Sequence, residues 1–185
     1  MLHFKGKFTF PTFLNKRRGV ILMRLIYDCL RSPYDIANIL QVVLATDGAC
    51  ELHLTGQSLR HDHRKVVGKI GSWSEKIRKS GLPSMSVHYH DSFEKCAEIM
   101  HSKGIRLIGT SPQATKSLFD ADLSGNDFAV VFGTEVGGLS KPKMALLDDI
   151  VQIPMGDQLD FMTLSVITPI VVYEILGQRR RANAP

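Results

Sequence analysis

Short apolar runs alternate with amphipathic segments in the first half of the chain. Residues 23–29 (MRLIYDC) are mostly apolar and predict a buried strand, and residues 33–46 follow with apolar positions at helical spacing. The same alternation predicts strands over 50–54, 86–89 and 105–109, helical stretches in the polar and basic segment up to residue 80, and a helix over 92–102. Because strands that alternate with helices form βαβ units, the pattern predicts an α/β fold with a mostly parallel sheet flanked by helices.

The second half of the chain continues this order. An apolar strand over 128–133 leads into a glycine-rich turn, a short helix from about Ser140 to Leu147 and another strand over 149–154. A final helix is predicted from near Thr163 to Arg181. Because Pro169 lacks an N–H group and Thr168 before it is a typical N-cap, we expect this helix to restart at Pro169.

The composition is typical of one globular domain. Of the 185 residues, 44% are hydrophobic and 22% are charged, which excludes a disordered or collagen-like chain. We expect an N-terminal basic extension over residues 1–22 and a single domain over 23–185. The three cysteines show no CxxC spacing and lie among apolar neighbours, as reduced thiols of cytosolic proteins do. The longest apolar stretch is too short and too interrupted to span a membrane, so we expect a cytoplasmic protein.

The net charge of +5 is concentrated in two blocks. Basic residues precede the first acidic residue, Asp28, and a second basic block lies between positions 60 and 79. Neutralising the phosphates of a nucleic acid releases counterions, so such blocks favour a polyanionic partner.

Three loops that follow strands carry the candidate chemistry. In open α/β sheets, ligands bind beyond the carboxyl ends of the strands. The three loops cover residues 108–112, residues 132–139 and the segment from 153–156 into 161–165. Neither GxGxxG nor GxxxxGK[ST] occurs in them, so the fingerprints of NAD and ATP sites are absent.

The order of these motifs resembles that of a known enzyme family. A strand ending in FGTEVGGLS, a strand ending in IPM and a polar loop that opens the last helix resemble motifs 2 and 3 of the SPOUT-class RNA methyltransferases, in the SpoU/TrmH-like branch. Residues 31–39 (RSPYDIANI) resemble motif 1, and the resemblance covers roughly residues 23–180. It implies a C-terminal deep trefoil knot in about 105–180, a homodimer, and transfer of a methyl group from S-adenosyl-L-methionine to a ribose 2′-oxygen of tRNA or rRNA.

The resemblance also assigns residues by position. Those that would hold the cofactor are Ile108, Gly109, Thr110, Gly133, Ile153, Met155, Phe161 and Met162. Glu135 would lie at the methyl-transfer site, with Asn38, Thr163 and Ser165 as positioning residues. With an RNA substrate, the basic residues expected to contact phosphates are Arg31, Arg60, Arg64, Lys65 and Lys69.

Gln41 keeps two other functions open. It stands where the family usually has an arginine that is proposed to activate the ribose hydroxyl, and a glutamine has no titratable proton. A catalytically inactive RNA-binding protein of the same fold, or methylation of a different acceptor atom, therefore remains an alternative. The alternation of strands and helices by itself leaves one more function open, that of an unrelated α/β protein that binds a nucleotide.

The histidines do not indicate a metal site or a further catalytic site. His61, Asp62 and His63 have no further ligand cluster at a recognisable spacing, so we expect an exposed loop there and no metal site. His88 and His90 alternate on one strand, where we expect surface or dimer contacts.

Overall fold

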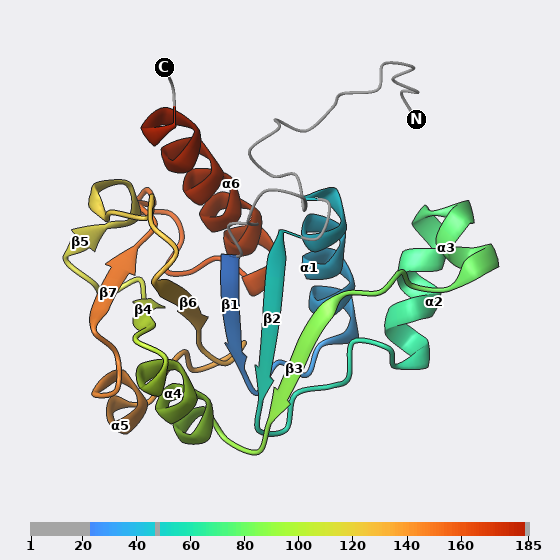
Figure 1. The fold of residues 1–185 in the computed structure, drawn as a ribbon, viewed down its shortest axis with the longest axis horizontal. Helices are drawn as coiled ribbons and strands as arrows, with labels where there is room; N and C mark the ends of the chain where they lie inside the picture. Colours follow the sequence, from blue (N-terminus) through green and yellow to red (C-terminus); the bar gives the residue numbers. More distant parts are fainter. Residues whose placement is uncertain (1–22, 47–48, 184–185) are drawn as a thin grey trace.

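Seven strands form one sheet in the computed structural model, which describes residues 23–46 and 49–183 (Figure 1). The predicted basic extension over residues 1–22 lies outside the described residues. The strand order is β3-β2-β1-β6-β4-β7-β5, and every neighbouring pair in it is parallel. The strands are β1 (Met23–Asp28), β2 (Cys50–Thr55), β3 (Ser86–His90), β4 (Arg106–Thr110), β5 (Lys116–Ser117), β6 (Phe128–Phe132) and β7 (Asp149–Gln152).

Helices cover both faces of the sheet. They are α1 (Pro33–Ala45), α2 (Arg64–Trp73), α3 (Glu75–Ser80), α4 (Phe93–Ser102), α5 (Lys141–Met144) and α6 (Leu164–Ala182). One apolar core joins α1, α2 and α6 to the sheet, and a second joins α4 and α5 to its other face (Figure 1). Among the described residues, no helix is long and apolar enough to cross a membrane.

The predicted α/β fold with a parallel sheet is confirmed, with differences in α5, β5 and α6. The helix predicted from Ser140 to Leu147 is shorter and ends at Met144. Strand β5 was not predicted, because its two residues are too few to show an apolar pattern.

The predicted restart at Pro169 is wrong, because α6 runs unbroken from Leu164 to Ala182. Thr168 is fully buried instead of capping a new helix. Its hydroxyl donates to the Leu164 carbonyl at 2.7 Å and lies 2.9 Å from the Tyr27 hydroxyl. These contacts hold the first turns of α6 against β1, and packing of this kind overrides the local preference of proline.

A partly buried ion pair joins the sheet to α5 beside the carboxyl ends of the strands. Asp28, the last residue of β1, is 1% exposed and accepts hydrogen bonds from Lys143 Nζ at 2.6 Å and Thr55 Oγ1 at 3.0 Å. Because all the strands are parallel, the loops after β4, β6 and β7 meet at this same edge.

Candidate functional site

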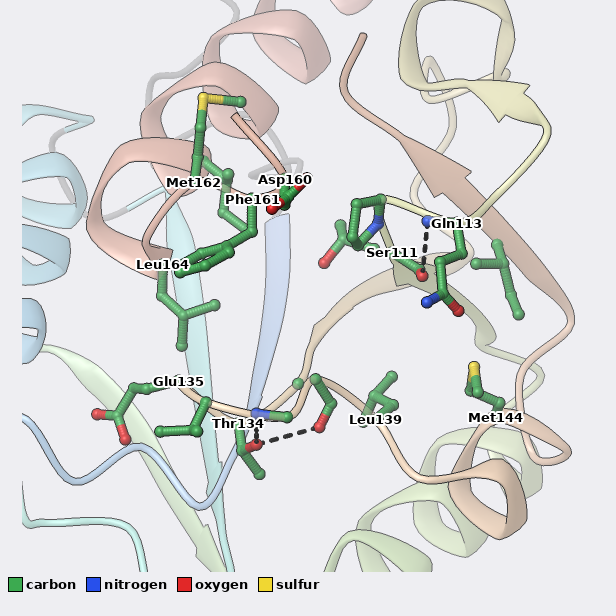
Figure 2. A pocket seen from close by; sticks show the side chains of 18 of the residues that line it. Ser111, Gln113, Thr134, Glu135, Leu139, Met144, Asp160, Phe161, Met162 and Leu164 are labelled. Carbon is green, nitrogen blue, oxygen red and sulfur yellow. Dashed lines mark hydrogen bonds between the residues drawn. The ribbon is translucent and has the colours of Figure 1, made fainter. Parts of the chain in front are cut away.

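A cleft of about 290 Å³ lies between the loops that follow β4 and β6, strand β7 and the start of α6 (Figure 2). Its walls come from segments that are far apart in the sequence. The lining residues are Thr110 to Gln113, Gly133 to Leu139, Met144, Leu147, Ile150, Asp160 to Met162, Leu164 and Ile167. The sequence predicted that a ligand binds at these loops, and the fold brings the loops together.

Gly133 allows the glycine-rich loop to fold back tightly. Thr134 and Gly138 form an isolated antiparallel bridge, closed by backbone hydrogen bonds of 3.0 and 3.2 Å. A Cβ atom on Gly133 would come within 2.6 Å of Gly138 Cα and the Leu139 nitrogen, so a larger residue would push the loop away. Gly138 itself has a φ of +63°, which glycine adopts readily.

The wall formed by α5 and β7 is apolar. Met144 of α5 lines it together with Leu139 and Leu147, which flank α5, and Ile150 continues it along β7. A Cβ atom on Gly109 would overlap Leu147 Cδ1, so this glycine lets Leu147 pack closely against β4. The polar side chains that line the cleft are those of Thr110, Ser111, Gln113, Thr134, Glu135 and Asp160, most of which Figure 2 labels.

Glu135 links the glycine-rich loop to the loop before α1. Its Oε1 atom accepts the backbone N–H of Ser32 at 2.6 Å and that of Arg31 at 2.9 Å. Figure 2 shows the carboxylate directed away from the middle of the cleft, as these bonds require. Ser32 in turn caps α1 by accepting the N–H of Asp35. The segment that resembles motif 1 is therefore anchored to the rim of the cleft.

The residues predicted to hold a cofactor gather here to different degrees. Thr110, Gly133, Phe161 and Met162 line the cleft itself. Ile153 and Met155 line a smaller adjoining hollow of about 60 Å³, which shares Thr110, Phe161 and Met162 with the cleft. Ile108 and Gly109 do not line either space and lie beneath it in β4, where Ile108 is 1% exposed.

The three predicted positioning residues lie outside the cleft lining. Thr163 is the N-cap residue of α6, and its hydroxyl lies 3.2 Å from that of Ser165. Asn38 is half-buried on α1. Between Thr163 and Ser165, Leu164 is the residue that reaches the cleft.

The predicted RNA-contacting residues border two shallow hollows near α1 and α2. Arg31 and Arg60 line one of them, and Lys65 and Lys69 line the other together with Tyr34. Arg64, in the first turn of α2, is exposed beside them. This surface continues from the rim of the cleft, because the backbone N–H of Arg31 bonds to Glu135.

Aromatic rings hold two of these cations in place. Lys69 Nζ lies 5.1 Å from the centre of the Tyr34 ring and 5.2 Å from that of Trp73. The Arg60 guanidinium lies 4.7 Å from the Tyr89 ring and pairs with Asp62, which raises the pKa of Arg60. Tyr34 is 63% exposed, so its ring is available to a ligand as well.

The apolar lining was missed by sequence reasoning. Met144, Leu147, Ile150 and Ile167 lie outside the three loops named from the sequence, and only the folded arrangement shows that they share a space with Leu139. The one sequence signal for this apolar lining was the group of apolar residues just after the glycine-rich turn.

Comparison with curated proteins finds methyltransferases. The chain is 28% identical over 161 residues to an uncharacterized tRNA/rRNA methyltransferase of Synechocystis sp., covering 87% of this chain and 55% of that protein. It is 35% identical over 151 residues to the 23S rRNA (guanosine-2′-O-)-methyltransferase RlmB of Shewanella oneidensis, covering 76% of this chain and 61% of that one. The chain thus spans between about half and two thirds of the length of these relatives.

Solved structures share the fold. The SpoU methyltransferase AviRb of Streptomyces viridochromogenes superposes with a TM-score of 0.71 at 22% identity, over 89% of this chain and 62% of that one. A structure described as giving insights into the 2-OH methylation of C/U34 on tRNA superposes with a TM-score of 0.70 at 22% identity, over 86% of this chain and 97% of that one.

The family comparison covers most of the described residues. The SpoU rRNA methylase family matches residues 23–173, from the start of β1 to the middle of α6. This range contains the three loops of the cleft and the segment that Glu135 anchors. The chain belongs to the SpoU rRNA methylase family.

Proposed function

We propose that this chain is an S-adenosylmethionine-dependent RNA methyltransferase that acts on a ribose 2′-oxygen of tRNA or rRNA. The observation that carries the proposal is the cleft, which is built at the carboxyl ends of the strands from loops that resemble the motifs of the family. A basic surface next to it favours RNA as the acceptor. We further propose that it acts in the cytoplasm.

The residues of the cleft fit the proposed cofactor. The volume of about 290 Å³ is near the lower end of the usual range for small-molecule sites, roughly 300–1,000 Å³. The apolar wall of Leu139, Met144 and Leu147 suits a flat adenine ring, and the carboxylate of Asp160 suits a positive charge of the cofactor. S-adenosylmethionine supplies a methyl group that is already activated on a sulfonium sulfur. A solved AviRb complex with AdoMet, with a TM-score of 0.69, supports this assignment.

The protein must then align the acceptor hydroxyl and accept its proton. Glu135 uses Oε1 to hold the Arg31 and Ser32 backbone, and no bond to Oε2 is found among the described residues. We assign to Oε2 the role of accepting the proton of the ribose hydroxyl. Arg31, which Glu135 fixes at the rim, would bind the neighbouring phosphate. Asn38, Thr163 and Ser165 remain proposed positioning residues.

We propose that the surface formed by Arg31, Arg60, Arg64, Lys65 and Lys69 binds the phosphates of the RNA. The stacked arrangement of Lys69 between Tyr34 and Trp73 supports this, because exposed aromatic rings beside cations also stack on unpaired bases. The Asp62 partner of Arg60 would have to be displaced by a phosphate.

The predicted trefoil knot is a further proposal. The connection from β4 to β6 runs out to β5 at the sheet edge and returns beside α6, where Gln178 donates to the Ala121 carbonyl and accepts the Leu123 N–H. Helix α6 also packs in the core with α1. These contacts support a path in which the segment before α6 passes inside the β4–β6 connection.

We propose a homodimer that uses α6 and the loop before it. Val166 and Tyr173, two helical turns apart on α6, are 47% and 53% exposed. Leu159 and Phe161 in the preceding loop are each 64% exposed. Large apolar side chains grouped in this way are typical of a protein interface.

The alternative of an RNA-binding protein without activity rests on Gln41. This residue is exposed on α1, and it lines none of the hollows described above. A glutamine there can still bind a phosphate by hydrogen bonds, but it cannot take a proton.

Methyl transfer separates the two functions. The protein is incubated with S-adenosylmethionine carrying a radioactive methyl group and with bulk tRNA or rRNA that lacks the modification, and the RNA is then digested with alkali. Methylation of a 2′-oxygen blocks cleavage of the following phosphodiester, so we expect the label in alkali-resistant dinucleotides. Label in single nucleotides would show a different acceptor atom, and RNA binding without any label would favour the inactive protein.

A further inference from the structure

The strands β2 and β3 present a polar face toward α4, at the opposite end of the strand order from β7 and β5. Alternate residues on β2 place Glu51 and His53 on this face, and alternate residues on β3 place His88 and His90 there. In the parallel pairing, His53 lies next to His88. The three imidazole rings stack, with His53 4.8 Å from His88 and 5.2 Å from His90 between ring centres.

His53 is the buried member of this cluster and has an unsatisfied nitrogen. The residue is 4% exposed, and its Nδ1 atom lies 2.9 Å from His90 Nε2. Its Nε2 atom is buried and has no hydrogen-bond partner. A buried polar atom without a partner destabilises the fold, so native proteins rarely leave one.

The surroundings of His53 Nε2 are those of a cation site. Glu51 Oε1 lies 3.8 Å from it, too far for a hydrogen bond, and the same oxygen lies 2.7 Å from His88 Nε2. A neutral His53 ring has one nitrogen lone pair. When Nδ1 donates to His90, that lone pair is on Nε2 and faces a carboxylate oxygen.

We propose that Glu51, His53 and His88 bind a divalent transition-metal ion of the Zn²⁺ class through Oε1, Nε2 and Nε2. The three ligand atoms all lie within 4.8 Å of one another. Ligand atoms about 2.1 Å from a tetrahedral Zn²⁺ are about 3.4 Å apart, a value between the 2.7 and 3.8 Å found here. The His53 and His88 ring planes are only 15° apart, so the half-exposed His88, whose Nε2 also lies 3.1 Å from the Ser86 hydroxyl, must rotate to direct its lone pair at the ion. This assignment replaces the sequence-based expectation that the chain has no metal site.

His90 serves as a positioning residue. A histidine that binds a metal usually donates its other N–H to a neighbouring acceptor, which fixes the ring. His90 Nε2 is that acceptor for His53 Nδ1. Cys96 groups with His53 and His90 and not with Glu51 and His88, so it lies outside the proposed ligand set.

Two nearby cations limit the affinity without blocking the site. Arg24 Nε contacts Glu51 at Oε2, 3.4 Å away, and so leaves Oε1 to the ion. Arg24 also donates to the Asn126 carbonyl, which holds its guanidinium. Lys103 acts on His53 only through its charge. We therefore expect a micromolar rather than a nanomolar site.

The test uses the untagged full chain, dialysed against a chelator and then titrated with Zn²⁺ in competition with a chromophoric indicator. We expect one ion per chain, and at least tenfold weaker binding by His88→Ala and by Glu51→Gln. His101→Ala is the matched control, because His101 is similarly exposed at 41% and also contacts a carboxylate, that of Asp148. It should bind Zn²⁺ as the unaltered chain does.

Co²⁺ distinguishes the ligand set. The proposed site predicts visible ligand-field bands without a thiolate charge-transfer band, and the same spectrum from Cys96→Ser. A thiolate band would overturn the assignment in favour of Cys96. The proposal is also overturned if the unaltered chain retains no Zn²⁺ at micromolar free metal, or if His88→Ala, folded by circular dichroism, binds as tightly. Methyl transfer does not enter either measurement, so the result is independent of the proposed function.

Discussion

Glu135 is the residue whose two proposed roles can be separated. Its Oε1 holds the loop before α1, and we assign proton acceptance to Oε2. Glu135→Gln keeps an oxygen for the two N–H groups but has no carboxylate to take a proton. We expect it to lower the methyl-transfer rate by about 10²-fold or more while S-adenosylmethionine affinity changes little. Glu135→Ala, the comparison variant, loses the loop contacts as well. If Glu135→Gln methylates RNA at the full rate and only Glu135→Ala is slow, the carboxylate only positions the loop.

Gly133 determines the path of the glycine-rich loop. A Cβ atom there would press on Gly138 and the Leu139 nitrogen, so Gly133→Ala must displace the loop of residues 134–138. We expect a loss of about 2 kcal/mol in unfolding free energy and at least tenfold weaker cofactor binding. Gly156→Ala is the control, since nothing lies within 4 Å of a Cβ atom at that position. Equal effects in the two variants, measured by urea unfolding and calorimetry, would contradict this account of the loop.

At the scale of elements, Asp148 joins α4, β4 and the start of β7. It accepts the Leu107 N–H at 2.7 Å and contacts His101 at 3.1 Å, and these bonds lower its pKa below the ordinary value of 3.8. A lowered carboxyl pKa stabilises the fold above the ordinary value, and this stability is lost as the pH falls through the native value. Asp148 is 43% exposed, so we expect Asp148→Asn to cost only about 1 kcal/mol at pH 7. Urea unfolding at several pH values should show this difference shrinking below pH 3.8, whereas a constant difference would contradict the charge effect.

The elements also show what the sequence could predict and what it could not. The apolar runs of β1 and β6 and the helical spacing of α1 depend on local periodicity, so their existence and order were predicted. The unbroken α6 was not, because the contact of Thr168 with Tyr27 crosses most of the chain. The cluster around His53 was missed for the same reason: its members lie on two strands, and the sequence does not show which strands are neighbours.

At the scale of the whole molecule, the basic surface beside the cleft should govern RNA binding. We expect the triple substitution of Arg64, Lys65 and Lys69 by alanine to weaken RNA binding and to reduce the slope of log K against log salt by about 2–3. The control removes three exposed basic residues elsewhere, Lys95, Arg106 and Lys116. Filter binding at several salt concentrations measures both slopes. If the two triple variants behave alike, the surface near α2 has no special part in RNA binding.

The central claim is that the cleft between the three loops is a cofactor site, and calorimetric titration of the full chain with S-adenosylmethionine tests it most directly. We predict saturable binding at one site per chain with a micromolar Kd, competition by S-adenosylhomocysteine, and loss of the heat in Gly133→Ala but not in Gly156→Ala. An absence of heat at high protein concentration, or unchanged binding by a folded Gly133→Ala, would contradict the claim.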